Sequence, residues 1–226
     1  MSQKWNKKDR PQMSHKPIKG CKKMENKTNQ KNNNEFYKVY DKTGKYLYDI
    51  DVSKEKELNN EYLHGVTCFV INEKDEVLME VRANTELTPG KIDLVSGHVN
   101  GDEVSLEAIL RELEEEVGIK GVLGADIKRV NDLAKPLGFE SKGKIRNFHI
   151  DFYCMQTKKH HFTIQPEEVA SLKWVPMEKA FDMIRAGETK FPKQQKNVNY
   201  DQIFDNVREV CKNRKIQKDI VMSWER

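Results

Sequence analysis

The sequence predicts an α+β fold, and three observations support this class. Short apolar runs bounded by turn residues, which are typical of strands, recur from residue 36 onward. One stretch, residues 105–117, carries its apolar residues at helical spacing, and two more such stretches follow residue 176. The chain shows no internal repeat. We therefore expect one modest domain of strands and helices, with polar segments outside it.

A hairpin opens the expected fold. Aromatic and apolar residues at 36–40 and 46–50 flank the turn sequence Asp41-Lys-Thr-Gly44. Residues 53–62, which follow, are charged and helix-tolerant. The clearest strand pair comes next: Val66–Ile71 and Val77–Val81, joined by a polar turn.

Residues Ile92–Val95 form a short apolar run after a turn at Thr88–Gly90. Further strands are expected where short apolar runs lie between turn signals, at Asp126–Val130, Phe148–Met155 and Leu172–Val175. Residues 131–147 are expected to form a long loop, a kind of segment that often lines a binding site. Two helices are expected at Met177–Ile184 and Asp201–Lys212.

The helix predicted at Ser105–Val117 ends at Gly118. At about 100° per residue, its core-facing stripe is expected to consist of Leu106, Leu110, Leu113 and Val117.

Charge is unevenly distributed along the chain. Residues 1–34 carry ten Lys and Arg against two acids, a net charge of +8, whereas the whole chain has 40 against 36, a net charge of +4. The remaining residues therefore carry −4, which weakens any interpretation as a nucleic-acid-binding domain, because such a domain needs a basic face on a folded module.

The N-terminal segment, residues 1–34, is expected to be a disordered basic tail. It contains six Asn and almost no apolar periodicity, so it cannot bury enough surface to offset the entropy of ordering. The tail is either a solvated segment or an arm that contacts nucleic acid or an acidic partner, and the sequence leaves both open.

We do not expect a membrane protein or a secreted protein. No apolar run approaches the roughly 18–20 residues of a membrane span, and the N-terminus has no apolar signal region. The four cysteines lie far apart without a C-x-x-C pair, so reduced, buried thiols are expected rather than disulfides. These features predict a cytoplasmic protein.

Three carboxylates, Glu112, Glu115 and Glu116, share one arc of the predicted helix. Like charges at this spacing repel, and Arg111, which can reach Glu115 and Glu103, cannot neutralise four acids alone. A hard divalent cation such as Mg²⁺, which takes oxygen ligands, would do so. The alternative is a solvated acidic helix face, and spacing alone leaves both interpretations open.

The segment from Gly97 to Ile119 resembles the Nudix box, G-x5-E-x7-R-E-U-x-E-E-x-G-U with U aliphatic, at all nine specified positions. The order of the surrounding strands fits the Nudix fold. The resemblance implies an α/β/α sandwich with a mixed central sheet between helices, plus the N-terminal hairpin and a C-terminal helix. It places a Nudix hydrolase domain at residues 35–190 and a C-terminal helical extension at 191–226.

The resemblance also implies hydrolysis of a diphosphate linkage, usually in a nucleoside diphosphate derivative, with Mg²⁺ or Mn²⁺. By position, the metal ligands are Glu112, Glu115, Glu116 and the carbonyl of Gly97. Arg111 orients the glutamates and Glu103 supports Arg111. Glu116 is the preferred general base, and Glu167 or Glu168 could supply a further ligand or base.

Flanking sequence resembles the branch that contains isopentenyl-diphosphate isomerases, at Tyr62–Gly65, Arg82-Ala83, Thr88–Asp93 and Ser96–Val99. In that branch, histidines matching His64 and His98 help hold a metal, and a Cys at the position of Ser96 moves the proton. Ser96 and the complete Arg-Glu-x-x-Glu-Glu pattern favour a hydrolase, with structural roles for both histidines. His64, His98 and Glu168 stay candidates for substrate binding.

Three functions are thus carried forward. The leading one is a diphosphate hydrolase whose partner is a small-molecule diphosphate. The alternatives are an isopentenyl-diphosphate isomerase-like enzyme and a non-catalytic Nudix-like module that binds nucleic acid through residues 1–34. Monomer and homodimer both stay open.

Overall fold

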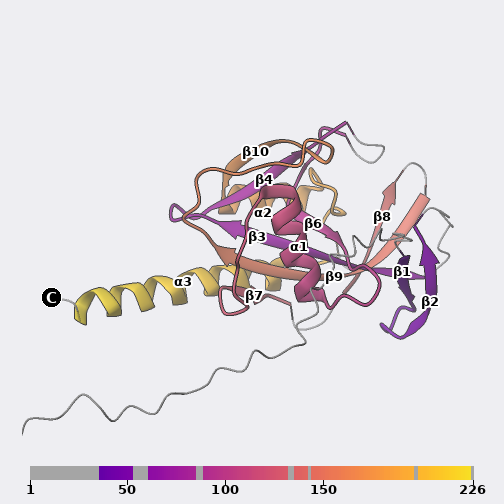
Figure 1. The fold of residues 1–226 in the computed structure, drawn as a ribbon, viewed down its shortest axis with the longest axis horizontal. Helices are drawn as coiled ribbons and strands as arrows, with labels where there is room; N and C mark the ends of the chain where they lie inside the picture. Colours follow the sequence, from indigo (N-terminus) through magenta and orange to yellow (C-terminus); the bar gives the residue numbers. More distant parts are fainter. Residues whose placement is uncertain are drawn as a thin grey trace, which may run out of the picture. The chain divides into compact units, whose positions relative to one another are not determined.

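The structure is a computed structural model that describes residues 36–52, 61–84, 89–131, 135–141, 144–195 and 198–224 (Figure 1). Side chains are described within these ranges except at 135–146 and after 213. The prediction for residues 1–34 lies outside the described residues, as does most of the helix-tolerant segment 53–62.

All the described strands belong to one ten-stranded sheet: β1 (Phe36–Tyr40), β2 (Tyr46–Asp51), β3 (Tyr62–Ile71), β4 (Glu76–Arg82), β5 (Ile92–Asp93), β6 (Val95–His98), β7 (Ile127–Arg129), β8 (Lys135–Ser141), β9 (Lys144–Gln156) and β10 (Val169–Pro176). β3 pairs in parallel with β9 along its whole length, whereas the other strand pairs among the described residues are antiparallel. The sheet is therefore mixed, as expected.

Helices cover both faces of this sheet. On one face, α1 (Ser105–Val117) packs Ile109 and Leu113 against Val66 and Cys68 of β3. On the other face, α2 (Met177–Ala186) and α3 (Asp201–Trp224) form a second core with the sheet. The α/β/α sandwich is thus confirmed, and α1 alone forms its layer among the described helices (Figure 1).

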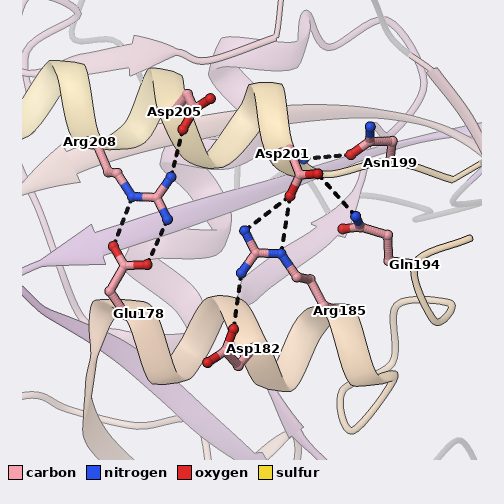
Figure 2. A network of polar contacts seen from close by, with 8 residues as sticks. All are labelled: Glu178, Asp182, Arg185, Gln194, Asn199, Asp201, Asp205 and Arg208. Atoms are coloured by element: carbon pink, nitrogen blue, oxygen red, sulfur yellow. Dashed lines mark hydrogen bonds and ion pairs between the residues drawn. The ribbon is translucent and has the colours of Figure 1, made fainter.

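Aromatic packing and ion pairs join α2 to α3. Phe181 and Phe204 stack with their ring centroids 4.1 Å apart. Figure 2 shows two arginine networks between these helices. The guanidinium of Arg185 lies 4.8 Å from the ring centroid of Phe204, and that of Arg208 lies 5.1 Å from the ring centroid of Phe181. Arg208 donates hydrogen bonds to both carboxylate oxygens of Glu178, and Arg185 bridges Asp182 and Asp201. The two helices therefore form one unit on the face of the sheet opposite α1.

The structure confirms the hairpin at β1 and β2 and the bounds of α1. The loop prediction was wrong, because residues 131–147 contain β8 and the first residues of β9, which pair antiparallel. The short apolar run Ile92–Val95 contains β5, which pairs with β4, and the start of β6, which pairs with β3.

The core stripe predicted for α1 was also wrong in part. Leu113 and Val117 are buried, but Leu106 and Leu110 are only partly so. Ala108 and Ile109 are buried instead, together with two residues of the predicted acidic arc, Glu112 and Glu116. The helix is therefore covered on more than one side, which a one-sided amphipathic pattern does not describe.

Cys68, Cys154 and Cys211 are buried cysteines in the reduced state, as predicted. Within the part of the chain that the structure describes, no helix is long and apolar enough to cross a membrane.

Replacing Phe204 by Ala should test the α2–α3 core. Phe204 is fully buried and contacts the rings of Phe69, Phe181 and Tyr200. We expect the free energy of unfolding in urea to fall by about 3 to 5 kcal/mol. Replacing the exposed Glu209 of the same helix by Ala should change it by less than about 0.5 kcal/mol. Equal values for the two variants would contradict this core.

Candidate active site

The site lies where the sheet splits. Among the described residues, β3 pairs with β4 only at Ile71 and Val77. Beyond this point β3 pairs with β6 and β4 pairs with β5, whereas β10 pairs with β4 along its opposite edge from Glu76 to Arg82. α1 contacts β6 and β3 beside this split. Glu112 and Glu116 lie four residues apart on α1 and therefore share one face of the helix. Both side chains are buried at this split.

Gly97 of β6 makes room for Glu112. A Cβ atom placed on Gly97 would overlap the carboxylate of Glu112 and lie 2.8 Å from its Cγ. Glu112 is 7% exposed, and burial raises its pKa to about 7, although the positive charge of Arg111 acts to lower it. The carboxylate therefore lies directly on the backbone of β6, which requires glycine at position 97.

Arg111 links the remaining residues of the predicted cluster. Its Nη1 lies 2.6 Å from Oε1 of Glu112 and 3.0 Å from Oε2 of Glu115. Its Nε donates to Oε1 of Glu103 at 2.7 Å, and Nη2 donates to the carbonyl of His98 at 2.9 Å. Glu103 also accepts a hydrogen bond from the backbone N–H of Asn100. Arg111 thus contacts both glutamates that it is predicted to orient as well as Glu103, and these roles stay predictions.

Glu116 is the most enclosed of the three helix glutamates, with 1% of its surface exposed. Its Oε2 accepts the backbone N–H of Ser96 at 3.0 Å. Burial raises the pKa of Glu116 well above its ordinary value, and the neighbouring charges of Glu80 and Glu112 add to this effect. Glu115 differs, because half of its side chain is exposed.

Two buried acids that we did not predict lie at the same split. Glu80 of β4 is 1% exposed and Asp93 of β5 is fully buried. Among the described residues, neither oxygen of Glu80 has a hydrogen-bond partner. Burial, with the charge of Asp93, raises the pKa of Glu80 to about 8. One signal could have found both residues: each is a lone acid inside an apolar strand sequence.

Two cations face these acids. The Nζ of Lys190 lies 3.1 Å from Oδ2 of Asp93 and also donates to the hydroxyl of Ser96. Nη1 of Arg82 lies 3.8 Å from Asp93 and 4.0 Å from Glu80. Lys190 follows α2 and is 94 residues from Ser96, so local sequence carries no signal for this contact.

The residues proposed for substrate binding are less closely grouped. Nε2 of His64 lies 3.1 Å from Asp151, and the ring of His98 stacks on Tyr37 with centroids 4.4 Å apart. Glu168 is exposed, and its charge acts on both Glu112 and Glu80. Glu167 is exposed as well. Substrate binding by His64, His98 and Glu168 stays a prediction.

The donor chemistry of the site fits a hard divalent cation, because several carboxylates converge with fewer cations and Glu80 has no hydrogen bond within the described residues. No ready group of three or more His, Cys, Asp or Glu ligands exists in the described ranges. Arg111 pairs with Glu112 and Glu115, so an ion would have to replace part of that pairing.

Comparisons with known proteins identify the family of this chain. Residues 61–196 match the family model described as NUDIX domain. Nudix hydrolase 3 of Arabidopsis thaliana is 27% identical over 185 residues, which cover 78% of this chain and 24% of the relative. Isopentenyl-diphosphate Delta-isomerase 1 of Photorhabdus laumondii subsp. laumondii is 38% identical over 68 residues, covering 29% of this chain and 39% of the relative. The matches thus span well under half of either relative.

A solved structure supports the fold. The crystal structure of DR0079 from Deinococcus radiodurans superposes with a TM-score of 0.51 at 19% identity, covering 70% of this chain and 93% of that protein.

Burial of Glu80 predicts a pH dependence of stability. Its folded pKa of about 8 exceeds the ordinary value of 4.5, so the folded state binds the proton more tightly. Wild-type stability should therefore fall as pH rises from about 4.5 to about 8. Glu80→Gln should be more stable than wild type by on the order of 2 kcal/mol at pH 8.5 and show little gain near pH 5.

Urea unfolding at both pH values with a chelator present measures this difference. The exposed Glu209→Gln serves as the control and should show no such trend. A gain for Glu80→Gln that is equal at both pH values would refute the assigned environment of Glu80.

Proposed function

The chain belongs to the NUDIX family, and on that premise we propose that it hydrolyses the diphosphate linkage of a nucleoside diphosphate derivative or a similar small molecule. One observation carries the proposal: the buried carboxylates Glu112 and Glu116 lie against the backbone of β6, with Arg111 linking Glu103, Glu112 and Glu115. Burying several carboxyl groups costs folding free energy, and buried ionisable groups of this kind are typical of active sites.

Nudix hydrolases act on pyrophosphate bonds and generally use divalent metal ions. In this chain, Glu112, Glu115, Glu116 and the carbonyl of Gly97 would hold Mg²⁺, or Mn²⁺ in its place. A bound cation would screen the phosphate charge and acidify the attacking water.

The chain's own residues supply the remaining chemistry. Water adds to one phosphorus, the bridging oxygen leaves with the electrons of the broken P–O bond, and the proton of the water passes to a carboxylate. Glu116 suits this role, because burial raises its pKa and so makes it a stronger base. The hydrogen bond from the backbone N–H of Ser96 fixes its orientation. Arg111 holds Glu112 and Glu115 in place.

The isomerase alternative is weakened by the contacts of Ser96. Its hydroxyl donates to the carbonyl of Leu94 at 2.9 Å and accepts from Lys190. A hydroxyl that already donates one hydrogen bond and accepts another is poorly placed to move a proton to or from carbon. The similarity to an isomerase covers 29% of the chain and does not change this preference.

A substrate panel with Mg²⁺ or Mn²⁺ tests the proposal. It contains nucleotide sugars, dinucleoside polyphosphates, NADH, coenzyme A, nucleoside triphosphates and prenyl diphosphates. We expect cleavage of at least one diphosphate, and Glu116→Gln should lower kcat by about 10²- to 10⁴-fold because the proton acceptor is lost.

Glu114→Gln is the matched control, since Glu114 lies on the same helix but is exposed and pairs with Lys120. Its kcat should stay within about twofold of wild type. Equal rates for wild type and Glu116→Gln on every compound would reject the hydrolase. Isomerisation of isopentenyl diphosphate that is lost in Ser96→Ala would favour the alternative.

A further inference from the structure

Lys190 reaches the split in the sheet from the segment that follows α2. Its neighbours Thr189 and Phe191 are buried, whereas the Lys190 side chain is 20% exposed. The ammonium contacts the fully buried Asp93 and the hydroxyl of Ser96. The backbone N–H of Ser96 in turn holds Glu116. A chain of contacts therefore runs from Lys190 through Ser96 to the carboxylate proposed as the base.

Carboxyl groups outnumber cations at this place. Three carboxylates, those of Glu80, Asp93 and Glu116, are each at least 99% buried. Within the described residues, the cations that lie near them are Lys190 and Arg82, and Arg82 approaches no closer than 3.8 Å. Neither oxygen of Glu80 has a hydrogen-bond partner among these residues. Buried carboxyl groups with too few cations take up either protons or a metal ion.

We propose that Lys190 is a positioning residue for the hydrolysis: it fixes Glu116 through Ser96 and is the built-in counter-cation of the buried Glu80–Asp93–Glu116 group. This deepens the proposed function and rests on it. Because the ammonium already supplies one positive charge, it limits how strongly these carboxylates attract a divalent cation. Lys190 therefore sets both the orientation of Glu116 and the affinity of the site for the ion.

A purely structural ion pair predicts a different outcome. If Lys190 only joined the segment after α2 to β5, its removal would loosen the fold and weaken cation binding. If it is the counter-cation, its removal leaves an extra uncompensated negative charge, and Mn²⁺ should bind more tightly. The sign of the change in Mn²⁺ affinity therefore separates the two roles.

The experiment titrates Mn²⁺ alone into the full chain and follows the free ion by electron paramagnetic resonance. Lys190→Met should lower the Kd for Mn²⁺ by about fivefold, and Asp93→Asn, which removes the opposite charge, should raise it by a similar factor. Lys190→Arg should stay within about twofold of wild type. The control is Lys193→Met, an exposed lysine three residues away, which should leave the Kd unchanged.

Kinetics supply the second readout. On a diphosphate cleaved by wild type, Lys190→Met should lower kcat by at least about tenfold with KM within about threefold, and Lys190→Arg should recover most of the loss. A Kd that is unchanged or raised in Lys190→Met, or a wild-type chain that binds no Mn²⁺, overturns the proposal. A tighter Kd in a chain that cleaves no diphosphate would reject the hydrolase but keep the role of Lys190 as counter-cation.

Discussion

Burial of Glu112 and Glu116 between α1 and the split sheet is the constraint on which the site depends. Charged groups removed from water are costly unless cations and hydrogen-bond donors surround them. This structure supplies Arg111 to Glu112, the N–H of Ser96 to Glu116, and a glycine at position 97 that lets the helix side chain touch β6. The compensation is incomplete, so burial raises the pKa of both carboxyl groups, and we propose that the site binds cations and, through them, phosphates.

The fold creates this constraint by separating β3 from β4. Because the two strands pair at one position only, β5 and β6 enter the space between them and carry Asp93, Ser96 and Gly97 into the split. α1 approaches from one face, and the segment after α2 brings Lys190 to the same residues. Phe191, Val198 and Tyr200 extend the core of the α2–α3 face, so the segment that carries Lys190 is held by the same packing as the two helices.

Much of this could be predicted where the signal is local. The hairpin, the bounds of α1 and the contact between Arg111 and Glu103 follow from turn chemistry, periodicity and the spacing of one motif. The rest depends on tertiary packing. Burial of Glu112 and Glu116 could not be inferred from a helical pattern that placed them opposite the core. The sequence of β8 is too polar to predict a strand, and it forms one because it pairs with β9. Lys190 meets Ser96 across 94 residues, a contact that no spacing rule contains.

The close approach of Gly97 to Glu112 is the most direct point at which to test this account. Gly97→Ala places a methyl group where the Glu112 carboxylate lies, whereas Gly124→Ala meets only Leu106 at 3.8 Å. The measurement is kcat/KM on a diphosphate that wild type cleaves, with the free energy of unfolding measured in parallel. We predict a loss of about 100-fold for Gly97→Ala and less than about twofold for Gly124→Ala, with both variants folded. A folded Gly97→Ala variant with wild-type kcat/KM would contradict the account.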